Sequence, residues 1–284
     1  MSFDLQDKAV LNDGVQMPWF GLGVYLAQEG QEVENSVRWA LEAGYRLVDT
    51  AAIYKNEAGV GKAVRESGVA REQLFLTTKL WNADQGYQST IKACENSLKA
   101  LDMDYIDLYL IHWPGLNRDD RLATWEAMLE LKHKQKVRSV GVSNFKPHHI
   151  DELIVAHGVV PSVDQVELHP FNTQEELRQY AKEKGIIVTA WGPIFHGHIS
   201  EAPEILSAIG EKYGKSAAQA VLRWHLQHGI SIIPKSVKKQ RIIENADIFD
   251  FALSDGDMAA IDGLNQNKRY GSDPDKMTFG FVNI

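Results

Sequence analysis

The sequence predicts a single α/β domain, a (β/α)8 TIM barrel that spans residues 1–284. Eight short apolar segments alternate with amphipathic helical segments, which is the pattern of a parallel sheet covered by helices. Eight such units in a chain of this length fit a closed barrel better than an open doubly wound sheet. No linker rich in proline, glycine or serine interrupts the series, so we expect one domain.

The elements follow one another in a regular order along the chain. Asp13-Gly14 lies between two short apolar runs and predicts an N-terminal hairpin. The expected strands are WFGLGVY (19–25), YRLVDT (45–50), LFLTTKL (74–80), YIDLYLIHW (105–113), VRSVGVSNF (137–145), SVDQVELHP (162–170), IIVTAWGP (186–193) and ISIIPKS (230–236). Helical periodicity marks segments between them, among them 31–43, 88–101, 121–134, 174–184 and 216–228, the last with Ser216 as its N-cap.

Composition excludes several classes of function. The formal charge of −8 argues against a surface for nucleic acid or anionic membrane. The single cysteine, Cys94, excludes an internal disulfide and suits a reducing cytoplasm. The N-terminus lacks the pattern of a signal peptide, and no stretch approaches the roughly 20 apolar residues of a membrane helix. We therefore expect a cytoplasmic protein.

Four residues at or just after strand ends form a candidate catalytic group: Asp49, Tyr54, Lys79 and His112. In a barrel these ends open on one face, where such folds place their active sites. An ammonium at Lys79, held by Asp49, would lower the pKa of the Tyr54 phenol, which is ordinarily near 10. His112 could donate a hydrogen bond to a bound carbonyl. A proton donor beside a polarised carbonyl is the requirement for reducing an aldehyde or ketone.

Each of the four residues also has a structural explanation. Asp49 could cap a helix or begin a turn. Tyr54 and Lys79 taken singly could be surface residues, and a histidine between Ile111 and Trp113 could be a hydrogen-bonded core residue. Their joint appearance on one face favours the catalytic interpretation.

A dinucleotide site is suggested where IPKSVKKQRIIEN runs from the last strand into a helix. Free backbone N–H groups around Ser236 and Val237 could bind phosphate. On the next helix Arg241 and Asn245 share a face. The set suits a ribose 2′-phosphate at Lys235, Ser236 and Arg241 and an adenine at Glu244 and Asn245, so NADPH is expected rather than NADH. The alternative is a solvated basic turn.

The nicotinamide end would lie at other strand ends. Ser143, Asn144 and Gln165 could hydrogen-bond a carboxamide, and Trp191 could stack on a flat ring. No Rossmann fingerprint is present. The His-Gly-His run at 196–198 has no further ligand nearby, so no metal is expected.

These motifs together resemble the aldo-keto reductase family over essentially the whole chain, and within it the bacterial dicarbonyl reductases that act on glyoxal, methylglyoxal or 2,5-diketo-gluconate. The matching motifs are MPWFGLGVY, DTAAIYKNEAGVG, TKLW, DLYLIHWP, GVSNF, QVELHP, AWGP and IPKSV with the following Arg241, Glu244 and Asn245. The resemblance implies a barrel closed below by the hairpin, NADPH bound without a Rossmann domain, and a monomer. It implies Tyr54 as proton donor tuned by Lys79 and Asp49, with His112 orienting the carbonyl. It also implies cofactor contacts at Gly23, Val24 and Gly192, and at the residues already named for the carboxamide, the stacking ring and the adenosine phosphate.

One loop departs from the family pattern. Residues 192–196 read Gly-Pro-Ile-Phe-His, where many members carry smaller residues beside the pyrophosphate, so cofactor release is expected to differ. The substrate is expected to be a small carbonyl, with broad specificity, in an aromatic pocket formed by Tyr25, Trp81, Trp113 and Phe171 around His112. Phe279, Phe281 and Val282 in the C-terminal tail would cover this pocket or form a packing strap.

The sequence is also compatible with two other functions. One is an NADPH-binding sensor subunit with little turnover. The other is an aldolase-type barrel in which Lys79 forms a Schiff base.

Overall fold

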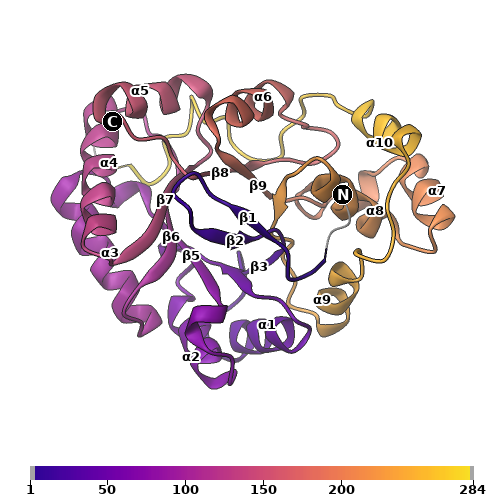
Figure 1. Cartoon of the computed structure of the whole chain (residues 1–284), viewed down its shortest axis with the longest axis horizontal. Coiled ribbons are helices and arrows are strands. Elements are labelled where there is room, and N and C mark those ends of the chain that lie inside the picture. Colours follow the sequence, from indigo (N-terminus) through magenta and orange to yellow (C-terminus); the bar gives the residue numbers. More distant parts are fainter. Residues whose placement is uncertain (1–3, 282–284) are drawn as a thin grey trace.

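The predicted barrel is present in the computed structural model, which describes residues 4–281 (Figure 1). Val282, part of the expected strap, lies outside the described residues. Each strand of the eight-stranded sheet pairs in parallel with its neighbours in chain order. They are β3 (Gly21–Gly23), β4 (Leu47–Asp49), β5 (Phe75–Leu80), β6 (Ile106–Ile111), β7 (Val137–Ser143), β8 (Val163–Glu167), β9 (Ile187–Trp191) and β10 (Ser231–Ile232).

The seam between β3 and β10 closes the barrel through two isolated bridges, Phe20 to Ile232 and Gly23 to Lys235. Both strands here are shorter than the seven residues expected from sequence. Pro234 lacks the N–H that would continue the ladder. At Gly23 a Cβ would lie 2.7 Å from the carbonyl oxygen of Ile233, so only glycine permits this close approach of the two chains.

The helices surround the sheet (Figure 1). They are α1 (Gln31–Glu42), α2 (Glu57–Glu66), α3 (Tyr87–Leu101), α4 (Arg118–His133), α5 (Pro147–His157), α6 (Glu175–Lys184), α7 (Glu204–Lys212), α8 (Ala217–Gln227), α9 (Lys239–Ala246) and α10 (Asp255–Asp262). The expected N-cap is confirmed, because the Ser216 hydroxyl accepts a hydrogen bond from the Gln219 N–H. Within residues 4–281 no helix combines the length and apolar character needed to cross a membrane.

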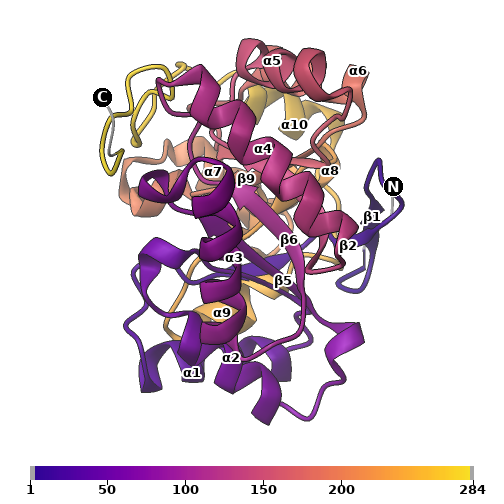
Figure 2. The same ribbon diagram turned by 90° about the vertical axis from the view of Figure 1, so that its left-hand side faces the viewer.

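The predicted hairpin, β1 (Lys8–Val10) and β2 (Gln16–Pro18), closes the amino end of the barrel. Leu11 and Met17 are buried against residues of the barrel interior, which include Leu47, Phe75, Leu108, Leu110 and Val163. At its tip, Asp13 pairs with Lys132 and accepts hydrogen bonds from the hydroxyls of Ser139 and Ser162. Figure 2 shows the hairpin and the C-terminal tail on opposite sides of the molecule. The hairpin therefore leaves the carboxyl ends of the strands free for a site.

Asp257 joins α10 to the end of α7 and provides a test of this packing. It pairs with Lys212 and accepts hydrogen bonds from the hydroxyls of Tyr213 and Ser254, both at 2.7 Å. The Lys212 ammonium first, and then the two hydroxyls, lower the pKa of Asp257 from 3.8 to about 2. Because the unfolded chain holds this proton more tightly, the carboxylate stabilises the fold above about pH 4 and loses that contribution as the pH falls toward about 2.

Asp257→Asn is therefore expected to lower the free energy of unfolding by about 1–2 kcal/mol at neutral pH, and by progressively less in acid. Urea unfolding across this pH range measures the difference from wild type. Asp255→Asn, an exposed residue of the same first turn, is the matched control. A penalty for Asp257→Asn that does not change with pH would contradict the assigned role of its charge.

Candidate active site

The centre of the carboxyl face is a buried ion pair between Asp49 at the end of β4 and Lys79 in β5. Lys79 Nζ lies 2.5 Å from Asp49 Oδ1 and donates a second hydrogen bond to the Thr50 carbonyl at 2.8 Å. Gln165 Nε2 donates to the other Asp49 oxygen at 2.7 Å. Asp49 thus binds side chains across the barrel rather than capping a helix, and Lys79 is fully buried rather than a surface residue.

Tyr54 and His112 lie beside this pair. Tyr54 ends a short 3-10 turn, Ala52–Tyr54, and Lys79 Nζ lies 5.2 Å from the centroid of its ring. The His112 ring meets the Tyr54 ring edge-on, with 5.8 Å between centroids. The structure therefore brings together all four residues of the candidate catalytic group.

Burial controls the charge of these residues. It raises the pKa of Asp49 and lowers the pKa of Lys79, and each partner's charge opposes the shift of the other. Burial, and then the charge on Lys79, hold the pKa of His112 well below its usual 6.5. At neutral pH His112 is therefore a neutral imidazole with one N–H to donate.

The net direction of the Tyr54 pKa differs from the one expected from the Lys79 ammonium alone. Lys79 was expected to lower the pKa of the phenol, but burial first, and then the negative charge of Asp49, raise that pKa well above 10.0. Asp49 offsets the ammonium at close range, so the loss of water around the ring dominates. Tyr54 is thus held in its protonated form, the form that can donate a proton.

Asn144 links the residues expected to bind a carboxamide. It follows β7 with a left-handed backbone (φ 61°), which asparagine tolerates better than most residues. Its Nδ2 donates to the His112 carbonyl at 3.0 Å and to the Ser143 hydroxyl at 3.1 Å, and its Oδ1 accepts from Trp191 Nε1 at 2.9 Å. The Ser143 hydroxyl donates to the Gln165 carbonyl at 2.7 Å. Ser143, Asn144, Gln165 and Trp191 are therefore linked in one hydrogen-bonded cluster beside the catalytic group, and Gln165 joins this cluster through its backbone carbonyl.

The loop after Trp191 folds back over it. Gly192 has a positive φ of 60° and turns the chain. Phe195 is fully buried, while His196 meets the Trp191 ring at 5.3 Å and the Tyr25 ring at 6.3 Å between centroids. His196 of this loop therefore contacts residues at the end of β9 and just after β3.

The expected phosphate segment lies at the barrel seam and the start of α9. Lys235 and Arg241 are exposed, and neither forms an ion pair with any residue of 4–281. In the described part of the chain the side chain of Lys238, the N-cap residue of α9, forms no capping hydrogen bond. Ser236 accepts a hydrogen bond from the Lys238 N–H at 3.1 Å. Open helix N–H groups beside two cations are suited to a phosphate.

The remaining residues of the expected cofactor site lie near this segment or connect it to the catalytic group. Asn245 is buried in α9, Glu244 is half-buried there, and Val237 packs on the core. Gly23 is bridged to Lys235, and the Val24 N–H donates to the Asp49 carbonyl at 3.1 Å. The end of β3 therefore connects the two parts of the site.

Aromatic rings extend from the catalytic group in two directions. Tyr25 lies 5.1 Å from the Tyr54 ring, and Trp81 meets His112 edge-on at 5.4 Å between centroids. Trp113 is buried next to His112 in the chain. Phe171 was expected in the same wall, but it is buried in the core, with 4.8 Å between the centroids of its ring and the Phe195 ring, in the tight turn bridged by His169 and Asn172 after β8.

Comparison with known proteins identifies the family. The family model described as aldo/keto reductase matches residues 20–266. The chain belongs to this family. It is 53% identical over 279 residues to a glyoxal reductase of Bacillus subtilis, which covers 98% of this chain and all of the relative. It is 45% identical over 267 residues to the methylglyoxal reductase DkgA of Escherichia coli, covering 94% and 96% of the two chains.

Solved structures agree with the fold. A variant of Gox0644 in complex with NADPH superposes with a TM-score of 0.92 at 42% identity, covering 97% of this chain and all of that one. A Bombyx mori aldo-keto reductase in complex with NADP gives a TM-score of 0.85 at 40% identity, covering 92% and 94%.

Two buried polar residues that support the site, Asn56 and Glu167, were not predicted from the sequence. Asn56 accepts a hydrogen bond from the Thr50 hydroxyl at 2.7 Å and donates to the carbonyls of Val24 and Ala27, both at 3.0 Å, so it joins the loops after β3 and β4. Glu167 is fully buried at the end of β8. A charged residue within the predicted strand 162–170 was the available signal for Glu167, whereas the sequence offers no comparable signal for Asn56.

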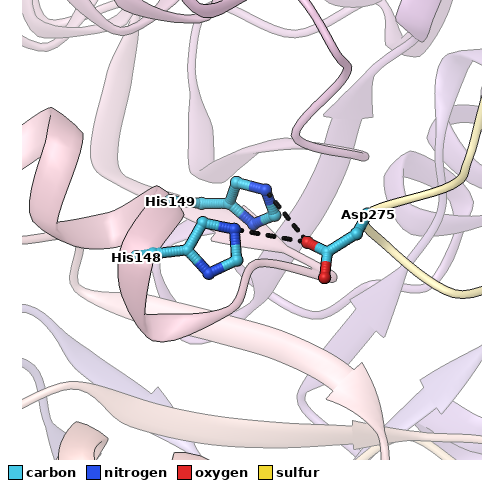
Figure 3. A group of neighbouring side chains, drawn as sticks. All are labelled: His148, His149 and Asp275. Atoms are coloured by element: carbon cyan, nitrogen blue, oxygen red, sulfur yellow. Dashed lines mark ion pairs between the residues drawn. The ribbon is translucent and has the colours of Figure 1, made fainter.

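A group of three potential metal ligands lies at the start of α5, although no metal was expected. His148, His149 and Asp275 bring their ligand atoms within 4.8 Å of one another (Figure 3). However, Nδ1 of His149 accepts a hydrogen bond from the Lys146 N–H at 3.2 Å, which places the ring proton on Nε2, the atom that faces Asp275. Lys146 also pairs with Asp275. This arrangement suits hydrogen bonds to a carboxylate better than a metal ion.

Proposed function

We propose that this protein uses NADPH to reduce small aldehydes, ketones and dicarbonyls, including glyoxal- and methylglyoxal-type compounds, to alcohols. The observation that carries the proposal is the buried Asp49–Lys79 pair beside a protonated Tyr54 and a neutral His112. Relatives named as glyoxal and methylglyoxal reductases, and solved neighbours bound to NADPH or NADP, support it. All of these residues belong to one chain, so the proposal requires no second copy.

The residues at the strand ends fit NADPH. Lys235 and Arg241, which form no ion pair within residues 4–281, offer cations for the 2′-phosphate, and the start of α9 offers N–H groups. At the other end, Trp191 presents a half-buried flat ring. Gln165 uses one amide N–H on Asp49, and no residue of 4–281 bonds its Oε1, which leaves an acceptor for a carboxamide N–H. NADPH, when bound, supplies the hydride.

The proton comes from Tyr54 in this mechanism. The neutral His112 donates its N–H to the carbonyl oxygen of the substrate and orients it toward the Tyr54 hydroxyl. As negative charge develops on that oxygen, Tyr54 transfers its proton and the alcohol forms. Lys79 then stabilises the phenolate left on Tyr54, because its ammonium is already held beside the ring and needs no reorganisation. Asp49 keeps Lys79 charged and in place.

The direct test is NADPH oxidation, followed by absorbance, with methylglyoxal and a panel of aldehydes, and in parallel with NADH. Consumption that depends on the carbonyl and favours NADPH is the expected result. Tight binding of NADPH without turnover on any carbonyl would instead support a sensor. Aldol cleavage in the absence of nucleotide would favour a Schiff base at Lys79.

Arg241→Ala is expected to weaken NADPH binding about 10- to 100-fold while changing NADH binding about twofold or less. The reason is that a charge-assisted hydrogen bond to the 2′-phosphate is lost, and NADH has no such group. Fluorescence titration with both nucleotides measures this. Lys239→Ala is the matched control on the same helix, since Lys239 instead faces Glu42 of α1 at 3.5 Å. Equal weakening of NADPH and NADH binding would show that Arg241 does not contact the 2′-phosphate.

A further inference from the structure

The C-terminal tail, residues 270–281, is attached to the carboxyl face of the barrel at three places. The first is Glu167, whose buried carboxylate accepts the N–H groups of Tyr270 at 2.6 Å and Gly271 at 3.0 Å. Gly271 lies directly on the Trp191 ring, because a Cβ there would come within 2.6 Å of it. The tail therefore starts next to the aromatic ring proposed to carry the nicotinamide.

The second attachment is Lys146, two residues after Asn144 and immediately before α5. Lys146 Nζ lies 2.8 Å from Asp273 Oδ1 and also pairs with Asp275. His148 and His149 approach the same Asp275 carboxylate at 3.3 and 3.4 Å (Figure 3). The half-buried Lys146 ammonium thus pairs with the carboxylates of Asp273 and Asp275. The imidazoles of His148 and His149 also contact the Asp275 carboxylate.

The third attachment is at Trp81. The Phe279 carbonyl accepts a hydrogen bond from Asn82 Nδ2 at 2.8 Å, and the Phe279 ring lies 5.9 Å from the Trp81 ring. Gly280 has a positive φ of 80°, and a Cβ on it would come within 2.5 Å of the indole. Trp81 in turn contacts His112. The Trp81 ring therefore connects the end of the tail to His112, the histidine that would orient the substrate.

We propose that Lys146 is a positioning residue that determines substrate specificity. By holding Asp273 and Asp275 it fixes the path of the tail, and so keeps Phe279 and Gly280 on Trp81 as the outer wall of the substrate site. Carbonyl compounds with an aromatic group reach this wall, whereas methylglyoxal, which is smaller, reaches His112 without touching it. The inference rests on the proposed function for its substrates, but the contact itself does not depend on turnover.

The first test compares Lys146→Met with wild type on phenylglyoxal and methylglyoxal. We expect KM for phenylglyoxal to rise roughly three- to tenfold, the range expected for losing a partly exposed ion-pair network that positions the wall. KM for methylglyoxal, kcat and the NADPH dissociation constant should change by about twofold or less. Lys146→Arg should restore KM for phenylglyoxal, and high salt should raise it in wild type but not in Lys146→Met. Lys62→Met, which removes the exposed pair with Glu34, is the matched control.

The second test is a double-mutant cycle with Phe279→Ala. If Lys146 acts through the tail, Lys146→Met should add little to the effect of Phe279→Ala on KM for phenylglyoxal. Fully additive effects, or equal changes in KM for both substrates, would overturn the proposal.

Hydrogen exchange of the tail separates this proposal from the proposed function. In Lys146→Met, without substrate or nucleotide, amides of residues 270–281 should exchange faster than in wild type and in Lys62→Met. Unchanged hydrogen exchange of these amides would overturn the positioning role of Lys146, whatever the carbonyl-reducing activity of the variant. Absence of carbonyl turnover in wild type would overturn the proposed function and with it the specificity role, whereas faster exchange would still uphold the contact.

Discussion

Tyr54→Phe is expected to lower kcat for carbonyl reduction about 100- to 10,000-fold, because it removes the only group proposed to donate a proton to the substrate. The dissociation constant of NADPH should change by about twofold or less. Among residues 4–281 no group is hydrogen-bonded to the Tyr54 hydroxyl. Its removal therefore leaves no buried partner unsatisfied, and the ring contacts with Tyr25 and His112 persist. Steady-state kinetics with methylglyoxal and a fluorescence titration with NADPH give the two quantities.

Tyr25→Phe is the matched control, since its exposed phenol lies against the same Tyr54 ring. It should keep kcat within a few fold of wild type. Near-native turnover by Tyr54→Phe would show that another group supplies the proton.

Lys79→Met is expected to combine the loss of activity with a loss of stability. Removing one partner of a buried ion pair leaves the other charge without compensation, which costs about 3–5 kcal/mol. Here the group left without its partner would be Asp49, which is 3% exposed and, among residues 4–281, keeps only the side-chain hydrogen bond from Gln165. Urea unfolding and methylglyoxal kinetics measure the two effects.

The double variant Asp49→Asn, Lys79→Met separates structure from chemistry. Neutralising Asp49 should recover much of the stability, because the uncompensated charge is gone, but it should not recover kcat, because no ammonium then stabilises the Tyr54 phenolate. Lys62→Met, which breaks an exposed pair, should cost about 1 kcal/mol or less. A single variant Lys79→Met as stable as wild type, or a double variant with restored activity, would contradict the roles assigned to the pair.

The order of elements and the residues of the candidate catalytic group could both be predicted from the sequence. Apolar runs followed by Asp49, Lys79 and His112 predict strands whose last residues are polar. This pattern can be seen within a few consecutive residues of the chain. The carboxyl ends of parallel strands necessarily lie at one end of a closed barrel. Consequently the convergence of these residues required only the number and direction of the strands.

Lengths of the seam strands could not be predicted in this way. The apolar pattern continues through 19–25 and 230–236, but beyond β10 the two chains are joined only by the isolated bridge from Gly23 to Lys235 among the described residues, and Pro234 offers no N–H to continue the ladder. Phe171 is an aromatic residue at a predicted strand end, which is typical of a pocket wall, yet it is buried against Phe195 in the turn after β8. Both outcomes depend on segments distant in sequence.

Charge states and the path of the tail were decided only by the tertiary structure. The sequence places an ammonium near Tyr54, but the direction of its pKa depends on how completely water is removed and on the distance to Asp49. Glu167 and Lys146 look like ordinary charged residues until the tail, more than a hundred positions later, supplies their partners. Sequence patterns specify local elements through periodicity and turn chemistry. Burial and long-range pairing arise only once those elements pack, and they determine what the side chains can do.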